Sequence, residues 1–313
     1  MCTSFTYKNN DFYFGRNLDL DCGFGQQVVI TPRNYAFSFH HVEDLKSHYA
    51  LIGMATVMDN VPLYAEAVNE KGLAMAGLQF TGNAVYYPFQ ENKSNVAPYE
   101  LIPWLLGQCD SIKEARKLLK EVSILDTPFK EGVPNSPLHW IIADKEETIV
   151  LESTKEGTQI YEDQVGVLTN NPPFPFHLYN LSQYLNVTKA YPNNRFSSTM
   201  ELTPYAAGMG AIGLPGDASS PSRFIHTAFL KENLVSDGTE KDNVQQFFRV
   251  LNSVAMIKGS VLTEQNTLDY TIYSSCINCD QGIYYYTTYE DSSIRKVEMK
   301  GYDLDQEELI SIS

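Results

Sequence analysis

The sequence has few cysteines and no long run of apolar residues. Its five cysteines are an odd number, and the N-terminus Met-Cys-Thr-Ser-Phe-Thr-Tyr lacks the basic and apolar regions of an export signal. We therefore expect reduced thiols and a cytoplasmic protein. No stretch approaches the ~18 consecutive apolar residues that a membrane helix requires, so we expect no association with a membrane.

Basic residues are also scarce. There are 23 Lys and Arg against 38 Asp and Glu, which gives a formal net charge of -15. Such a charge repels phosphate backbones and anionic lipid surfaces, so it argues against binding to nucleic acid or to a membrane surface. It does not exclude a small anionic substrate, because a few local arginines can still receive one.

Metal and nucleotide motifs are weak. Cys276 and Cys279 have the spacing of half a zinc site, but the six histidines supply no second pair at close spacing. Residues 208–213 match G-x-G-x-x-G by letter, yet Leu214-Pro-Gly-Asp follows, which indicates a turn and not a helix start. We predict a loop there, ordinary turn residues at both cysteines, and no metal or organic cofactor.

The pattern of the chain favours an α+β fold in a single domain over residues 1–313. Apolar and β-branched segments separated by short turns predict strands, mostly antiparallel. These strands are expected at residues 3–7, 12–16, 27–31, 50–55, 73–79, 138–144, 148–153, 166–169, 268–274, 282–288 and 294–299. Helices are expected at 111–122, with a capping box formed by Ser111 and Glu114, and at 223–230 and 242–256.

The first two predicted strands form a hairpin that places the N-terminus close to charged residues of the second strand. With a turn at residues 8–11, Cys2 lies opposite Asn17, which brings Arg16 and Asp19 close to the thiol. A guanidinium favours the thiolate, a carboxylate can hold a terminal amine, and an α-amine with a pKa near ~8 can act as a general base. The alternative is that Cys2 is a small residue at a strand start and that Arg16 and Asp19 form a surface ion pair.

Several motifs, in order along the whole chain, resemble those of the choloylglycine hydrolases, the family of bile salt hydrolases and penicillin V acylases. They are Met1-Cys-Thr, Phe14-Gly-Arg-Asn-Leu-Asp, Asn69-Glu-Lys-Gly-Leu-Ala-Met-Ala-Gly-Leu, Leu138-His-Trp-Ile, Val167-Leu-Thr-Asn-Asn-Pro, Gly213-Leu-Pro-Gly-Asp, Ser222-Arg-Phe and Tyr284-Tyr-Tyr-Thr-Thr-Tyr. The resemblance implies a four-layer αββα sandwich with two central antiparallel sheets. It also implies a homotetramer and a small-molecule amide substrate.

The resemblance further implies a set of catalytic residues. Cys2, exposed by removal of Met1, would be the nucleophile and its own α-amine the base, in a reaction that passes through a thioester. Arg16 and Asp19 would support the thiolate and the amine. The remaining roles fall to Asn170 and Gln79 as donors to the oxyanion, and to Arg223, which orders the site. From the sequence alone, Asn170 could equally be a turn residue.

The substrate remains open at this stage. Bile salts are our first choice, and penicillin V is the alternative. Gln79 departs from the Asn that is common in bile salt hydrolases, and Ala206-Ala207-Gly208 lacks the Arg of taurine-preferring relatives, so we expect glycine conjugates before taurine conjugates. An amidotransferase would need a further domain, and a chain that keeps Met1 would be a ligand-binding relative without catalysis.

Overall fold

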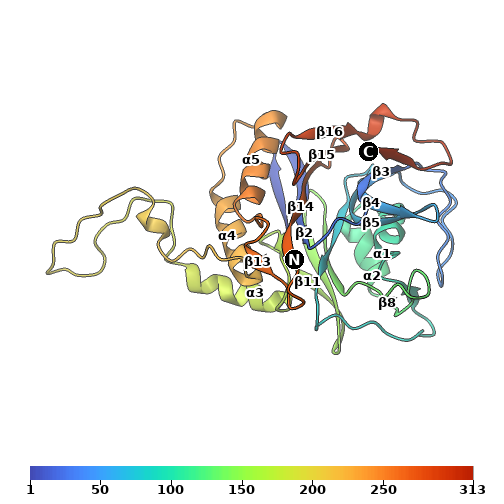
Figure 1. Ribbon diagram of the computed structural model, residues 1–313, viewed down its shortest axis with the longest axis horizontal. Helices are drawn as coiled ribbons and strands as arrows, with labels where there is room; N and C mark the ends of the chain where they lie inside the picture. The colour runs from blue at the N-terminus through green and yellow to red at the C-terminus, as the bar shows by residue number, and fades with distance from the viewer. Residues whose placement is uncertain (313) are drawn as a thin grey trace.

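The computed structural model describes residues 1–312 and contains two central antiparallel sheets (Figure 1). In the first sheet, β1 and β2 form the N-terminal hairpin and β14 lies beside β2. Its strands in spatial order are β12 (Val167–Leu168), β1 (Cys2–Asn9), β2 (Asp11–Leu20), β14 (Leu268–Asn278), β15 (Ile283–Thr288) and β16 (Arg295–Glu298), with β13 (Val261–Leu262) paired to β14.

The second sheet packs against the first. Its strands in spatial order are β11 (Gly157–Glu162), β10 (Thr148–Thr154), β9 (Leu138–Ala143), β6 (Ala74–Gln79), β5 (Val61–Asn69), β4 (Leu51–Met58), β3 (Gln27–Thr31) and β17 (Ile310–Ile312). Central strands such as β2 and β9 are buried on both faces because each sheet has a neighbouring layer on either side. One apolar cluster fills the space between the sheets and includes Phe14, Ile52 and Ile141.

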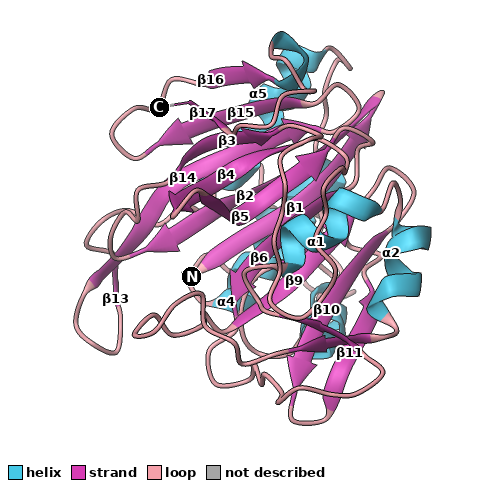
Figure 2. Ribbon diagram, turned by 90° about the vertical axis from the view of Figure 1, so that its right-hand side faces the viewer, coloured by secondary structure: helices cyan, strands magenta, loops and turns pink. Residues whose placement is uncertain are grey.

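Helices cover both outer faces (Figures 1 and 2). The helices α1 (Leu101–Gln108) and α2 (Ile112–Leu119) pack on the second sheet, where Trp104, Leu105 and Ile112 join a separate apolar cluster. On the other side, α4 (Ser220–Asn233) and α5 (Glu240–Asn252) pack on the first sheet, with α3 (Phe174–Leu181) beside α4. The predicted αββα sandwich is confirmed. A short parallel pair, β7 (Ser94–Val96) and β8 (Val122–Ile124), and the 3-10 turns η1 (Ser182–Tyr184), η2 (Met209–Ala211) and η3 (Met299–Gly301) complete the elements.

The predicted hairpin register was wrong by one residue. Cys2 pairs with Leu18 and not with Asn17, because the strands continue to the pair Asn9 and Asp11 and leave only Asn10 at the turn. Asn10 has a φ of 62°, a left-handed conformation that asparagine tolerates better than most residues. The sequence Lys-Asn-Asn-Asp therefore forms a tighter turn than the four-residue turn we expected.

The predicted capping box was also wrong, although α2 is present. Ser111 occupies the N-cap position, but its side chain makes no capping hydrogen bond. The carboxylate of Asp144 instead accepts from the backbone N–H of Ile112 at 2.7 Å, and that of Glu114 accepts from Asp110 N–H at 3.1 Å. One free N–H group of the helix start is thus satisfied by Asp144, which follows strand β9.

Candidate active site

A largely apolar cavity of about 470 Å³ has Cys2 and Arg16 in its wall. Most of its lining comes from β2, the second sheet and two loops. Large apolar side chains dominate: Leu18, Leu20, Phe24, Met58, Phe129 and Trp140. Gln79 also lines it, so three of the predicted site residues face one space that is large enough for a small organic molecule.

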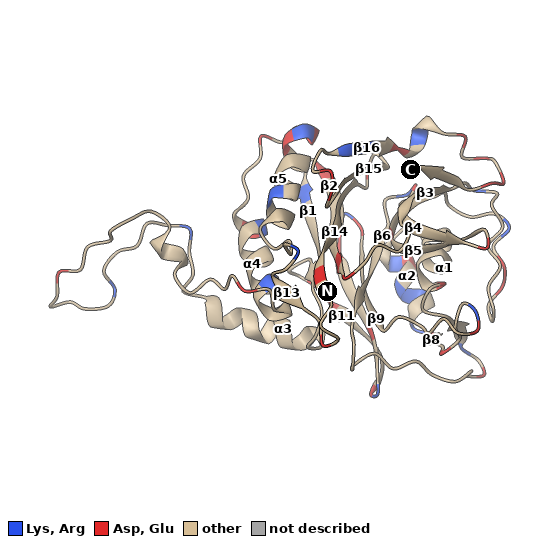
Figure 3. Ribbon diagram, in the orientation of Figure 1, with Lys and Arg blue, Asp and Glu red and all other residues tan. Residues whose placement is uncertain are grey.

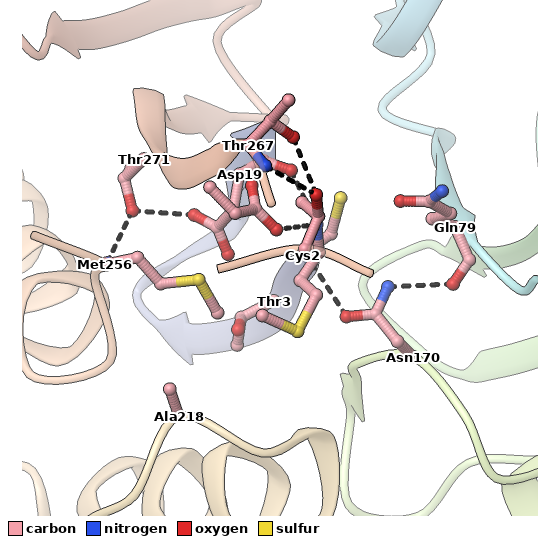
Figure 4. Close-up of polar contacts among 12 residues, drawn as sticks. Cys2, Thr3, Asp19, Gln79, Asn170, Ala218, Met256, Thr267 and Thr271 are labelled. Carbon is pink, nitrogen blue, oxygen red and sulfur yellow. Dashed lines mark hydrogen bonds and ion pairs between the residues drawn. The ribbon is translucent and has the colours of Figure 1, made fainter. Parts of the chain in front are cut away.

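Asn170, from the segment after β12, is held tightly against Cys2 (Figure 4). The backbone N–H of Cys2 donates to Asn170 Oδ1 at 2.8 Å, and Arg223 Nη2 donates to the same oxygen at 2.7 Å. Asn170 Nδ2 donates to the carbonyl of Gln79 at 2.8 Å. Arg223, from α4, also donates to the Cys2 carbonyl and to Thr3 Oγ1. These contacts join four of the six predicted residues.

The backbone of Gln79 points toward the same place. Phe80 N–H bonds to the carbonyl of Pro137, and in an antiparallel pair the bonded positions alternate, so Gly77 and Gln79 direct their polar groups away from β9. The carbonyls agree with this, since that of Gly77 accepts from Arg16 and that of Gln79 accepts from Asn170. In a strand, the N–H and C=O of one residue point to the same side. Gln79 N–H therefore faces the side occupied by Asn170 and Cys2.

Arg16 extends from β2 to the place in the second sheet where strands β5 and β6 stop pairing, which we call the fork. Strands β5 and β6 pair from Val68 to Glu66, and the next pair in register would be Ala65 and Gly77. Arg16 Nη1 donates to both of these carbonyls, at 3.1 and 2.6 Å. Burial alone would lower the pKa of Arg16, but the Cys2 thiol, Tyr273 and Glu66 nearby outweigh this and raise it. Arg16 thus remains charged beside the thiol.

Asp19 is fully buried at the end of β2. Its Oδ1 accepts from Thr271 Oγ1 at 2.6 Å (Figure 4), while its backbone pairs with that of Met1. Burial raises the pKa of the Asp19 carboxyl, and the positive charges of Arg223 and the N-terminus oppose that rise. Arg16 and Asp19 are both buried, so the alternative of a surface ion pair between them is wrong.

While Met1 is attached, the terminal ammonium belongs to Met1 and not to Cys2. The Met1 ammonium donates to the carbonyl of Asp19 at 2.6 Å and to Asp269 Oδ2 at 3.1 Å. The nitrogen of Cys2 is therefore a peptide nitrogen and no base. Cleavage after Met1 would turn it into an amine at the position where Asn170 Oδ1 already accepts from it.

Sequence reasoning missed the residues that bind the backbone of the Asn170 segment. Ser220 Oγ accepts from Asn170 N–H at 2.8 Å, and His177 Nε2 lies 2.9 Å from the Asn170 carbonyl. His139 Nε2 lies 3.0 Å from the carbonyl of Thr169. The His-Trp motif after Leu138 was a signal, but only the fold reveals that its histidine supports the segment of Asn170.

Three weaker predictions can be placed as well. Ala206–Gly208 does not line the cavity of its own chain but lies on a long loop that extends away from the body (Figure 1). The G-x-G-x-x-G match falls on this loop and on η2, so the predicted loop is confirmed there. Cys276 lies inside β14 and not in a turn, which corrects that part of the prediction, whereas Cys279 follows the strand.

The described residues contain neither a metal-binding cluster nor a membrane-spanning helix. Within residues 1–312, no group of three or more His, Cys, Asp or Glu side chains is arranged to hold a metal ion. In that same range the helices are too short or too polar to cross a membrane. All five cysteines are free thiols.

Comparison with known proteins identifies the family. The family described as linear amide C-N hydrolases, choloylglycine hydrolase family, matches residues 2–312. The chain therefore belongs to the choloylglycine hydrolase family, which confirms the resemblance seen in its motifs.

Its relatives agree with this assignment. A bile salt hydrolase/transferase of Lactiplantibacillus plantarum is 48% identical over 99% of this chain and 96% of its own length, and one of Clostridium perfringens is 37% identical over 99% and 95%. A crystal structure of a mutant conjugated bile acid hydrolase from Clostridium perfringens superposes with a TM-score of 0.92 at 36% identity, covering 100% of this chain and 97% of that one. Penicillin V acylase from Agrobacterium tumefaciens, at 18% identity and a TM-score of 0.79 over 99% of this chain and 90% of its own, shares the fold.

Proposed function

We propose that this enzyme hydrolyses the amide bond of conjugated bile salts. The observation that carries the proposal is the position of the Cys2 thiol in the wall of a large apolar cavity, beside Arg16 and next to amide donors of Asn170 and Gln79. A steroid is a rigid apolar body that suits such a cavity. Relatives that are 37–48% identical over nearly the full chain are named bile salt hydrolase/transferase or conjugated bile acid hydrolase.

The geometry supports a two-step mechanism at an N-terminal cysteine. The α-amine takes the thiol proton, and Cys2 Sγ attacks the acyl carbon to give a tetrahedral oxyanion. Asn170 Nδ2 and Gln79 N–H donate to that oxyanion, while Arg16 stabilises the thiolate and Asp19 supports the amine. The C–N bond breaks as the ammonium returns its proton to the leaving amine. Water then attacks the thioester, which releases the acid and restores the thiol.

Transfer follows from the same intermediate. The relatives from Lactiplantibacillus plantarum and Clostridium perfringens are both named bile salt hydrolase/transferase. If an amine and not water attacks the thioester, the acyl group passes to that amine and a new amide forms. The same residues serve both outcomes, so competition between water and amine sets the product.

The substrate class is tested by turnover of three amides by the processed enzyme. We expect glycocholate and taurocholate to be hydrolysed faster than penicillin V, because the cavity is large and apolar and the penicillin acylase shares only the fold. Released glycine or taurine and the penicillin product are measured side by side. Faster turnover of penicillin V would contradict the proposal and would indicate that penicillin V is the preferred substrate.

The preference between conjugates stays a prediction. The absence of an Arg at Ala206–Gly208 favours glycine conjugates by resemblance, but these residues do not line the cavity of their own chain. The ratio of glycocholate to taurocholate turnover in the same assay tests it, and a ratio below one contradicts it.

A homotetramer is supported by the long loop between η1 and α4, which we call the arm (residues 185–219). Figures 1 and 3 show it extending from the body with few charged residues. Its exposed large apolar side chains are Leu185, Tyr191, Phe196, Met200, Leu202, Tyr205 and Ile212. An apolar segment of this kind needs a partner, and we infer that a second copy of the chain covers it.

Charged substitutions on the arm should weaken this assembly. In Leu185→Glu/Phe196→Glu, we expect a shift from tetramer to smaller species in light scattering after gel filtration, because each glutamate would have to be desolvated at the interface. The matched control is Val235→Glu, an exposed apolar residue outside the arm. A tetramer that persists in the double variant at low concentration contradicts a role of the arm in assembly.

Two broader expectations remain predictions. We infer a cytoplasmic location from the reduced state of all five cysteines and the acidic composition. We also keep the description of residues 1–313 as one domain. Fractionation of the source cells and limited proteolysis test these two statements respectively.

A further inference from the structure

A second buried carboxylate lies behind Arg16, on the side away from substrate. Glu66 of β5 is fully buried between the two sheets. Its Oε2 accepts from Tyr273 hydroxyl at 2.6 Å, and its Oε1 accepts from Ser275 Oγ at 3.0 Å and from the Tyr284 hydroxyl. Arg16 Nη1 lies 3.8 Å from Oε2.

The donors around Glu66 match an ionised carboxylate. A carboxylate has about four acceptor positions, and here three hydroxyl donors and one guanidinium surround it. All three hydroxyls come from β14 and β15 of the opposite sheet. Burial raises the pKa of Glu66, and Arg16 and the three hydroxyls oppose that rise. A charge buried this deeply is costly unless it has a partner.

Arg16 has little freedom on the side of the fork. Both N–H bonds of Nη1 are directed at the carbonyls of Ala65 and Gly77, the residues next to Glu66 and Ala76. Arg16 and Cys2 both line the cavity, and the nearby Cys2 thiol contributes to the raised pKa of Arg16. The guanidinium is therefore close both to the Glu66 carboxylate and to the Cys2 thiol.

We propose that Glu66 is a positioning residue for the reaction, which holds the Arg16 guanidinium at the fork between β5 and β6 so that its charge acts on the Cys2 thiol. Glu66 touches neither the cavity nor the reacting atoms, and it acts through Arg16. Tyr273 and Tyr284 fix the carboxylate in turn. This inference rests on the proposed role of Cys2 and adds a residue to it.

Glu66→Gln tests the proposal because glutamine keeps the size of the side chain. Its amide places N–H donors where the carboxylate accepted, so the guanidinium loses the charged partner that anchors it and is no longer held in one position beside the thiol. We expect the pH midpoint of Cys2 alkylation by iodoacetamide to rise by about 1 unit, which corresponds to about tenfold less thiolate at a given pH. We expect kcat to fall by a similar factor with a smaller change in KM.

The measurement uses the processed protein in a Cys22→Ser background, because Cys22 is the exposed thiol, and follows the Cys2 peptide by mass spectrometry. Besides Glu66, Tyr273 and the Cys2 thiol act on Arg16, and Arg223 lies close to Cys2, Asp19 and Asp269. Processing adds the α-amine of Cys2. None of them is altered in the variant. Thermal melting checks that each variant is folded.

Two controls separate positioning from a general loss of structure. Asp163→Asn removes another buried carboxylate, one that holds the turn before β12 through backbone N–H groups and is remote from the cavity, and it should leave the midpoint unchanged. In an Arg16→Leu background, Glu66→Gln should produce no further shift, because a residue that acts through Arg16 has no effect without it.

A midpoint that stays unchanged, or that moves to lower pH, overturns the proposal, since the latter would mean that Glu66 acts only as a nearby negative charge. The proposal is also overturned if Glu66→Gln shifts the alkylation midpoint by the same amount in the Arg16→Leu background. Alkylation reports the ionisation of Cys2 whether or not Cys2 is the nucleophile. Failure of this test is therefore distinct from failure of the proposed function, which hydrolysis by a Cys2→Ala variant would reveal.

Discussion

Cys2→Ala should abolish hydrolysis while the protein remains folded and binds its substrate. Removing a nucleophile typically lowers kcat by about 10⁴-fold or more, and no other cysteine lines the cavity. The Cys2 side chain is buried and small, so alanine fits its site with the loss of one sulfur atom. Amine release from glycocholate measures the activity, and calorimetric titration with glycocholate measures binding.

The matched control for this variant is Cys22→Ala. Cys22 is exposed and lies outside the cavity, so its loss should leave turnover unchanged. Appreciable hydrolysis by processed Cys2→Ala, at more than a trace above the rate without enzyme, would remove Cys2 as the nucleophile. Loss of substrate binding together with activity would instead indicate that the thiol is part of the binding surface.

Asn170→Asp should lower kcat by about 10²–10³-fold or more, the usual effect of removing one donor to an oxyanion. Aspartate keeps an oxygen at Oδ1, which accepts from Cys2 N and Arg223, but it replaces the Nδ2 donor by a second oxygen. Negative charge would then develop next to a carboxylate. Steady-state kinetics on glycocholate measure the effect, and we expect KM to change far less than kcat.

The neighbouring variant Asn171→Ala serves as a control for this segment. Its Nδ2 donates to the carbonyl of Thr81 and not toward Cys2. We expect turnover close to that of the unaltered enzyme. Similar losses in Asn170→Asp and Asn171→Ala would mean that both act by disturbing the loop, and that Asn170 has no specific role at the oxyanion.

Much of the candidate site could be predicted because its residues lie in short motifs with fixed local surroundings. Cys2, Arg16 and Asp19 belong to one hairpin, and the structure places Arg16 in the cavity wall beside Cys2 and Asp19 against Met1, even though the register was wrong by one residue. Asn170 and Arg223 could be located only through the family resemblance, since their local sequences do not indicate that they contact Cys2.

The parts that could not be predicted depend on contacts between distant segments. Glu66 is the one acidic residue of β5, a strand that also carries Pro62, and its partners lie more than 200 residues later. The helix α1 was missed because Leu101–Gln108 is apolar all round and shows no helical period. The fork between β5 and β6 arises from strand pairing, which the sequence of either strand alone does not specify.

The central claim is that the free amine of Cys2 acts as the base once Met1 is gone. The most direct test compares two preparations of one sequence, one processed and one made while methionine aminopeptidase is inhibited, each defined by intact mass. We predict rapid hydrolysis of glycocholate by the processed chain and none by the chain that keeps Met1, whose Cys2 nitrogen is a peptide nitrogen. Equal turnover by the two preparations would contradict the account.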